Sequence, residues 1–539
     1  MGGGVILLVL ACTERAVRPS VILEGPDFWD HPWPSDTRDL GVFPTEGVDF
    51  LDTALSLTGE LSGWGTTQAL FFRLDRVIEG EPELTLSGGE EVPLDVVFLE
   101  DGGPYGAPHL VAALPVQGFP LQPGTTYTAS AYGSEWQFTT QDPIEELARF
   151  VEAAREEPTP SPGQWTETDR FEDYCVFEST LSMPVYQVGE PPFQNEGGTW
   201  AHDGALQAWE EARIVVTLPL GEAPEGGWPT VVFSRTGGGG LRPLVDHGPA
   251  DAEGVIAPGT GVALDFARAG WAGVSVDGPH GGLRNVTGGD EQFLMFNILN
   301  PGAMRDNVRQ SALELALVPD ILEGLELSGE ACGGSVDTGS LVLMGHSMGA
   351  TIAPLTLAQG GYIGAILSGA GGSWIHNIVY KQSPLEVRPL AEAMLDHPGL
   401  HPHDPTLSLV QWTGESADPP VYGAAIQQLG VQVLMLQGIV DTYILPPMAN
   451  ATSWSLGLDL ARPALDVDHP DLQGFVPAQD MLAWSGGQLV DLPAAPGLVI
   501  QHVEDGLQDG HEVLFQKEEP RAQIRSFLSS LAQGQPLVE

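Results

Sequence analysis

The chain has 539 residues, with 72 acidic and 21 basic side chains, which give it a net charge of −51 at pH 7. This charge excludes nucleic acid as a partner, because phosphate binding needs clusters of Lys and Arg that the sequence lacks. Apolar residues make up 42% of the chain and charged residues 17%, so large hydrophobic cores are expected and disorder is not. The length predicts more than one domain, and the acidity is typical of a soluble, salt-adapted or extracellular protein.

Residues 5–11 form an apolar run that is far too short to span a bilayer. The run ends at Ala11-Cys12, which resembles the lipobox of bacterial lipoproteins, although no Lys or Arg precedes it and Leu10 is bulky for its place. We therefore predict that residues 1–12 are a signal peptide ending at Cys12, whose lipidation provides the only membrane attachment. Such a protein would be exported to the bacterial outer membrane, cell surface or periplasm. The alternative is a cleaved or degenerate signal peptide without a lipid.

Two further cysteines, Cys175 and Cys332, are present besides Cys12. In an oxidising compartment such a pair can form a disulfide, but two exported cysteines can also stay apart. The sequence leaves both arrangements open.

Residues 26–140 are predicted to form a small all-β domain, because short apolar and β-branched runs alternate here with turns that contain Gly or Pro. The pattern L-x-P-G-T-x-Y at 121–127, followed by F-x-T at 138–140, resembles the closing hairpin of bacterial Ig-like domains. No cluster of titratable residues suggests chemistry in this part. We predict an Ig-like sandwich with a structural or presentation role.

The segment 141–164 is predicted to be a helix followed by a linker. Apolar residues recur at helical spacing from Ile144 to Ala154. The Pro-rich stretch 157–163 is typical of a semi-rigid linker and predicts a domain boundary. From residue 165 to 535, strand-like runs alternate with helical stretches, which is the pattern of a doubly wound α/β sheet.

The strand predicted at 229–234 leads into four consecutive glycines at 237–240. Glycines let backbone N–H groups approach a ligand closely, although four of them also suit a plain surface loop. A second strand-like run, 270–276, ends at Asp277, and His280 follows in a Gly-rich loop. We expect Asp277 and His280 to organise hydrogen bonds of this loop rather than to react.

Residues 345–349, Gly-His-Ser-Met-Gly, fit the pattern G-x-S-x-G. They lie between the apolar run 340–344, which has the length of a buried strand, and the helix-like stretch 350–358. A turn this tight has no room for Cβ atoms beside the serine, and it would hold Ser347 in a strained conformation with Oγ raised above the sheet edge. We predict that Ser347 is a nucleophile; the alternative is an ordinary Gly-rich turn.

An acid and a histidine follow Ser347 in the order of a catalytic triad. Asp441 comes just after the predicted buried strand 431–438, and His511 comes a short loop after the predicted strand that contains His502. His511 would take the proton from Ser347, while Asp441 would fix the imidazole tautomer and stabilise the imidazolium. His502 is a rival base, although its place in a strand favours a packed histidine. Asp441 could also be only a loop-capping aspartate.

Three histidines, His397, His401 and His403, alternate with prolines in one loop. No Cys or carboxylate spacing supports a closed metal site, so we predict incidental loop histidines and no metal.

Taken together, residues 165–535 resemble the α/β-hydrolase superfamily. With the N-terminal features, the chain resembles the surface-anchored bacterial lipase and esterase lipoproteins of that superfamily. The resemblance implies a doubly wound α/β-hydrolase sheet with cap insertions, preceded by the small Ig-like β domain. It also implies that the N–H groups of Gly237 and Met348 form the oxyanion hole. The family usually has His-Gly where this chain has Arg235-Thr236, so the loop of this chain departs from the family pattern just before Gly237.

Two stretches, 370–425 and 445–498, interrupt the predicted core pattern, and apolar runs such as 375–380 and 385–395 suit a cap over an acyl pocket.

The activity that the resemblance implies is hydrolysis of carboxylic esters through an acyl-enzyme, with a small-molecule ester or lipid as substrate and without a cofactor. Amide or peptide cleavage by the same triad is an alternative that the sequence leaves open. A second alternative is a non-catalytic anchored binding protein on a hydrolase scaffold. Such a scaffold would have no need for Ser347, Asp441 and His511 together.

Overall fold

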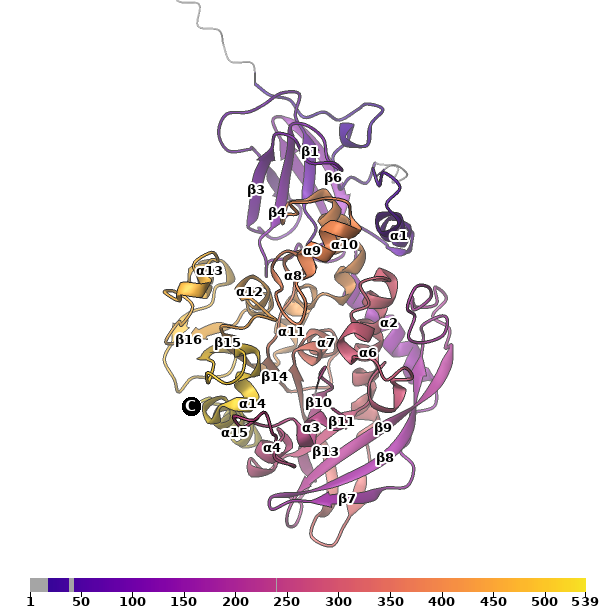
Figure 1. Cartoon of the computed structure of the whole chain (residues 1–539), viewed down its shortest axis with the longest axis vertical. Helices are drawn as coiled ribbons and strands as arrows, with labels where there is room; N and C mark the ends of the chain where they lie inside the picture. The colour runs from indigo at the N-terminus through magenta and orange to yellow at the C-terminus, as the bar shows by residue number, and fades with distance from the viewer. Residues whose placement is uncertain (1–17, 38–42, 239) are drawn as a thin grey trace, which may run out of the picture.

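The structure is a computed structural model that describes residues 18–37, 43–238 and 240–539. The predicted signal peptide, with Cys12, lies outside these residues. Figure 1 shows small sheets of the N-terminal region at one end of the molecule and a large sheet with its helices at the other. Within the described ranges, no helix has the length and apolar character needed to cross a membrane.

A 12-stranded sheet forms the centre of the larger part. Its order is β17-β16-β18-β15-β14-β13-β10-β11-β9-β8-β7, with β12 paired to β13 off this path. The strands from β18 to β11 in this order are parallel, whereas β9, β8 and β7 are antiparallel to their neighbours. The strands are β7 (Thr166–Arg170), β8 (Tyr174–Val185), β9 (Ala208–Pro219), β10 (Trp228–Ser234), β11 (Ala272–Val276), β12 (Glu326–Ser328), β13 (Gly333–His346), β14 (Gly364–Ser368), β15 (Gln432–Ile439), β16 (Asp459–Ala461), β17 (Leu489–Val490) and β18 (Leu498–Val503).

Helices cover both faces of this sheet because its central strands are apolar on both sides. Successive residues join different cores: Val231 and Val342 pack into one, and Val232 and Leu343 into the other. On one face lie α6 (Pro301–Leu322) and α7 (Met348–Leu357), and on the other α4 (Ala263–Arg268) and α15 (Glu518–Ala532). This is the α/β-hydrolase fold, so the predicted fold class is confirmed.

The N-terminal region contains two three-stranded antiparallel sheets, β1-β4-β3 and β2-β5-β6. The predicted closing hairpin is present, with Tyr127 opposite Phe138. A helix, α1 (Asp49–Leu57), lies inside the segment expected to be all-β; Leu51, Ala54 and Leu57 bury one face of it at three-residue spacing. The small β sheets are confirmed, and the Ig-like assignment stays a prediction. The strands are β1 (Leu70–Arg73), β2 (Thr85–Ser87), β3 (Leu94–Leu99), β4 (Leu110–Pro115), β5 (Thr126–Ala131) and β6 (Ser134–Thr139).

The helix predicted to follow these sheets is α2 (Pro143–Glu156). Pro143 occupies its first turn, where no backbone N–H is needed, and the side chain of Asp142 accepts a hydrogen bond from Glu145 N at 3.0 Å.

The N-terminal sheets pack against the first predicted insertion. Their core is continuous with α8 (Trp374–Tyr380), α9 (Val387–Met394) and α10 (Pro405–Gly414), of which α9 and α10 lie just below β4 and β6 in Figure 1. Trp64 stacks on Trp412 with ring centroids 4.7 Å apart. The buried carboxylate of Glu415 accepts hydrogen bonds from Thr66 N and Thr67 N. The N-terminal region is therefore joined to this insertion by a shared core as well as by the chain.

The second predicted insertion, 445–498, extends the sheet edge with β16 and β17 and adds two helices. The remaining helices are α3 (Pro243–Asp246), α5 (Glu291–Met295), α11 (Gly423–Leu429), α12 (Pro446–Ser455), α13 (Ala478–Ser485) and α14 (Val513–Gln516).

Cys175 of β8 and Cys332, just before β13, form a disulfide. The two residues lie 157 positions apart, so their proximity comes from the packing of the strands and not from local sequence.

Candidate active site

Ser347 stands at a sharp turn between β13 and α7. Its backbone has φ 52° and ψ −118°, and its N–H donates to Ser368 O at 2.9 Å. A non-glycine residue at positive φ carries strain of about 1 to 3 kcal/mol, which persists only where the surroundings impose it. The turn has the strand-turn-helix context that the sequence predicts.

The two glycines of the motif are required by close backbone contacts. A Cβ on Gly345 would lie 2.4 Å from Gly349 O, and a Cβ on Gly349 would lie 2.7 Å from Ser234 O. The second contact also places the end of β10 directly against the turn. The Gly-rich loop after β10 therefore starts beside Ser347.

Asp441 and His511 meet at the same edge of the sheet because they follow the adjacent parallel strands β15 and β18. His511 Nδ1 lies 2.8 Å from Asp441 Oδ2, and the two residues are 3% and 4% exposed. The other carboxylate oxygen, Oδ1, accepts hydrogen bonds from Tyr443 N at 2.8 Å and Ile444 N at 2.7 Å. Asp441 thus caps its own loop and also holds the imidazole, so the two interpretations of this residue are compatible.

Aromatic rings hold the His511 imidazole in place. Tyr443 stacks on it with ring centroids 4.5 Å apart and planes 14° from parallel, and His346 packs at 4.8 Å. Among the described residues, His511 Nε2 has no hydrogen-bond partner although it is buried. Ser347 and His511 line the same pocket, so the serine and the histidine without an Nε2 partner lie beside one cavity. Contacts between a nucleophile and its base are often loose before substrate binds.

The two neighbouring histidines differ in pKa because their surroundings differ. Burial lowers the pKa of His511, but the Asp441 carboxylate outweighs it and brings the pKa above the ordinary histidine value. Burial, and then the charge of His511, hold the pKa of His346 well below the ordinary value. His511 is therefore the histidine that can become an imidazolium.

The predicted oxyanion-hole residues flank Ser347. Met348 N belongs to the first turn of α7, where backbone N–H groups lack intrahelical partners, and Gly237 lines the pocket shared by Ser347 and His511. The structure thus brings both residues to the nucleophile.

Arg235 shapes the loop that carries Gly237. Its buried guanidinium pairs with Glu291 at 2.6 Å and Asp277 at 3.2 Å, and it donates to Gly240 O and Leu241 O. Arg235 occupies the position of the His in the His-Gly pair that the resemblance predicts. Sequence reasoning missed its role, for which the only signal was a lone Arg at the end of an apolar strand.

The remaining candidates lie outside this cluster or serve as scaffolding. Asp277 also accepts from Leu283 N, and His280 contacts Asn307 Oδ1 at 3.1 Å, so both organise loops as predicted. His502 lies in β18 and contacts Gln523 Oε1 at 2.9 Å.

The loop histidines make separate contacts: His397 with Asp404 at 2.6 Å, and His403 with Asp95 at 3.2 Å. In the part of the chain that the structure describes, no group of three His, Cys, Asp or Glu side chains could hold a metal ion.

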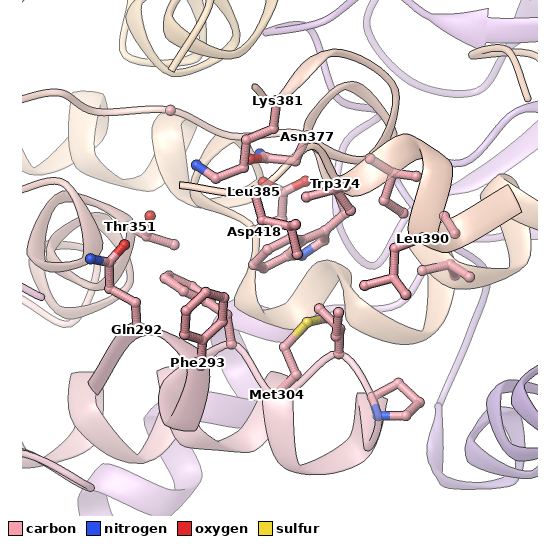
Figure 2. Close-up of a pocket in the computed structure, with 18 of the residues that line it drawn as sticks. Gln292, Phe293, Met304, Thr351, Trp374, Asn377, Lys381, Leu385, Leu390 and Asp418 are labelled. Carbon is pink, nitrogen blue, oxygen red and sulfur yellow. The ribbon is translucent and has the colours of Figure 1, made fainter. Parts of the chain in front are cut away.

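A cavity of about 170 Å³ opens beside Ser347 and Met348. Its walls come from α5, α6, α8, α9 and α10, so the predicted cap segment 370–425 does cover it, and Phe50 of α1 contributes from the N-terminal region. Figure 2 shows Met304 and Leu390 at one side of this cavity and Gln292, Thr351 and the Lys381 amine toward the other. The apolar lining residues are Phe50, Phe293, Phe296, Ile298, Met304, Trp374, Ile378, Leu385, Val387, Leu390, Met394, Leu395, Leu407, Val410 and Ile444.

No protein-family model matches the sequence, and no curated protein is detectably similar to it. Among solved structures, an acetyl xylan esterase from a Paenibacillus species is similar over 67% of this chain and 87% of its own, with 13% identity and a TM-score of 0.39.

Two further structures are similar to this chain. An acetyl xylan esterase from a Thermoanaerobacterium species matches 58% of this chain and 84% of its own, with 14% identity and a TM-score of 0.37. A carbohydrate esterase family 15 glucuronoyl esterase from Caldicellulosiruptor kristjansonii matches 72% and 85%, with 11% identity and a TM-score of 0.35.

Proposed function

We propose that the protein is a serine hydrolase that cleaves carboxylic esters, with Ser347 as nucleophile, His511 as base and Asp441 as the acid that orients it. The observation that supports this most is the buried Asp441–His511 pair, because His511 has no partner at Nε2 among the described residues and lines a pocket with a serine on a strained turn. Nucleophile, base and orienting acid in this relation are the requirements of acyl transfer.

The proposed reaction has two steps, acylation of Ser347 and hydrolysis of the acyl-enzyme. His511 Nε2 takes the proton of Ser347 Oγ as Oγ bonds to the ester carbonyl carbon, and the carbonyl oxygen becomes an oxyanion that the N–H groups of Met348 and Gly237 stabilise. The imidazolium, held by Asp441, then protonates the departing alcohol and leaves an acyl-enzyme. His511 next takes a proton from water, whose oxygen attacks the acyl carbon. The imidazolium then returns that proton to Ser347 Oγ as the bond between Oγ and the acyl carbon breaks and the carboxylic acid leaves.

The cavity beside Ser347 favours an apolar acyl or alcohol group. Burying one methylene contributes about 0.8 kcal/mol, which is about a fourfold gain in transition-state binding for each carbon that the walls enclose. We therefore propose that esters of medium chain length are better substrates than acetate esters.

A series of p-nitrophenyl esters from two to sixteen acyl carbons tests this proposal. We expect kcat/KM to rise from two to about six or eight carbons, and the matching amides to react far more slowly. A fall from acetate onward would contradict the acyl pocket, and efficient peptide cleavage would replace the ester proposal with the peptidase alternative. No turnover of any ester or amide would favour the non-catalytic scaffold.

We also propose that the chain is exported and anchored through a lipid on Cys12. The support is the lipobox-like sequence and the disulfide between Cys175 and Cys332, because disulfides persist in oxidising compartments. Replacing Cys12 by Ser should move the protein from the membrane fraction to the soluble fraction. An unchanged membrane fraction would count against the anchor.

A further inference from the structure

Lys381 is a cation beside the proposed active site, and no carboxylate of the described residues forms an ion pair with it. It is one of two lysines in a chain with 72 acidic residues, and it lines the cavity just after α8. Its Nζ donates to Tyr443 O at 2.9 Å and lies 5.7 Å from the centre of the Tyr443 ring. In the described part of the chain, no carboxylate is within ion-pair distance of this Nζ. An ammonium has three N–H donors, so two remain for another acceptor.

The nearby carboxylates are already used by other donors. Asp441 accepts from Tyr443 N, Ile444 N and His511. Asp418, which also lines the cavity, accepts from Ser373 N at 2.7 Å and Gln411 Nε2 at 2.7 Å. Neither carboxylate neutralises Lys381 by direct contact, which leaves its charge for a ligand.

The position of Lys381 relates its charge to the reacting ester. Tyr443, whose carbonyl holds the lysine, stacks on His511, so the ammonium lies on the His511 side of the cavity. In Figure 2 the Lys381 amine points toward the side where Gln292 and Thr351 lie, away from Leu390. An ester at Ser347 would therefore have the apolar wall on one side and a positive charge on the other.

We propose that Lys381 determines specificity by binding a carboxylate carried by the ester substrate. The inference rests on the proposed ester hydrolysis, and it deepens that function by naming the substrate class as carboxylate-bearing esters with an apolar segment. Burial lowers the pKa of Lys381 to about 8, so the ammonium keeps its proton in most molecules at neutral pH. A charged hydrogen bond in a partly dehydrated cavity is stronger than a neutral one.

Two matched ester pairs test the inference and also show which half of the ester carries the carboxylate. The acyl-side pair is p-nitrophenyl hexanoate and the mono-p-nitrophenyl ester of adipic acid. The alcohol-side pair is phenyl hexanoate and 4-carboxyphenyl hexanoate. We expect Lys381→Met to lower kcat/KM for the charged member of one pair by about ten- to a hundredfold, and to leave the neutral member within about threefold.

Lys517→Met is the matched control. Lys517 Nζ also donates to a backbone carbonyl, Val503 O at 2.8 Å, but it does not line the cavity. We expect this variant to leave kcat/KM unchanged for all four esters. If Lys381→Met lowers kcat/KM for charged and neutral esters alike, or for neither, Lys381 only stabilises the Tyr443 loop and the inference is wrong. If the Met variant does not fold, Lys381→Arg should keep the preference for the charged ester and Lys381→Gln should lose it.

A binding measurement separates this inference from the proposed activity. Isothermal titration of monomethyl adipate and methyl hexanoate into Ser347→Ala protein needs no turnover. We expect tighter binding of the adipate ester, and loss of that difference when Lys381→Met is added. Equal binding of the two esters would overturn the inference even if the enzyme hydrolyses neutral esters. A Lys381-dependent difference in binding, together with a wild-type protein that hydrolyses no ester, would support the inference and contradict the proposed function.

Discussion

Replacing Asp441 by Asn should disable the base while it leaves the fold intact. Oδ1 of Asp441 accepts from two backbone N–H groups, those of Tyr443 and Ile444, so the amide oxygen of the Asn must take this place. The amide NH₂ then faces His511 Nδ1 in place of the carboxylate oxygen that lies 2.8 Å away. Two donors would meet, and His511 would have to carry its proton on Nε2, where it can no longer accept one from Ser347.

The expected loss is about 10⁴-fold in kcat, which corresponds to about 5.5 kcal/mol of transition-state stabilisation. The assay is hydrolysis of p-nitrophenyl hexanoate at pH 8, with thermal unfolding as a check on the fold. The reverse orientation of the amide would place its NH₂ group against two backbone N–H donors, which is unfavourable. His511 therefore stays in the tautomer that carries its proton on Nε2.

Asp509→Asn is the matched control, because Asp509 accepts from Thr442 N and His511 N but does not touch the imidazole. Its loss of kcat should stay within about tenfold. A folded Asp441→Asn protein that keeps more than a tenth of the activity would refute the role given to Asp441.

Three other expectations concern His511, its pKa and the buried Glu415. His511→Ala should reduce kcat by about a thousandfold or more, whereas His502→Ala should change stability more than rate; the opposite pattern would make His502 the base. kcat/KM should rise with pH, because only the neutral imidazole of His511 accepts a proton. The midpoint of this rise should lie above pH 6.5, because Asp441 raises the pKa of His511. A midpoint below pH 6 would contradict this. Glu415→Ala should lower the free energy of unfolding by at least about 3 kcal/mol in urea titrations, because it leaves Thr66 N, Thr67 N and Gln141 Nε2 without their acceptor. An unchanged urea midpoint would show that this contact does not stabilise the fold.

The places of Ser347, Asp441 and His511 in the fold could be predicted from the sequence because each residue follows a local signal. Ser347, Asp441 and His511 each come shortly after a buried apolar strand, and parallel neighbouring strands end at the same sheet edge. The alternation of strands and helices likewise predicts the doubly wound sheet. These features depend on periodicity and turn residues, which short segments encode.

The rest depends on contacts between segments that are far apart in the chain. Phe50 lines the cavity although it lies almost 300 residues before Ser347, and no local pattern connects the two. Lys381 looks like any exposed lysine in the sequence; its place beside Tyr443 arises only when the loops fold together. The helix α1 was missed because its nine residues follow a stretch rich in turn-forming residues.

Labelling with a fluorophosphonate probe, followed by peptide mass spectrometry, tests the central claim most directly, because such probes react with an activated serine and not with ordinary hydroxyls. The account predicts one adduct per chain, located on Ser347, that disappears in Ser347→Ala and becomes far slower in His511→Ala. Absence of labelling in folded wild-type protein, or an adduct on a different serine, would contradict the assignment of Ser347 as the nucleophile.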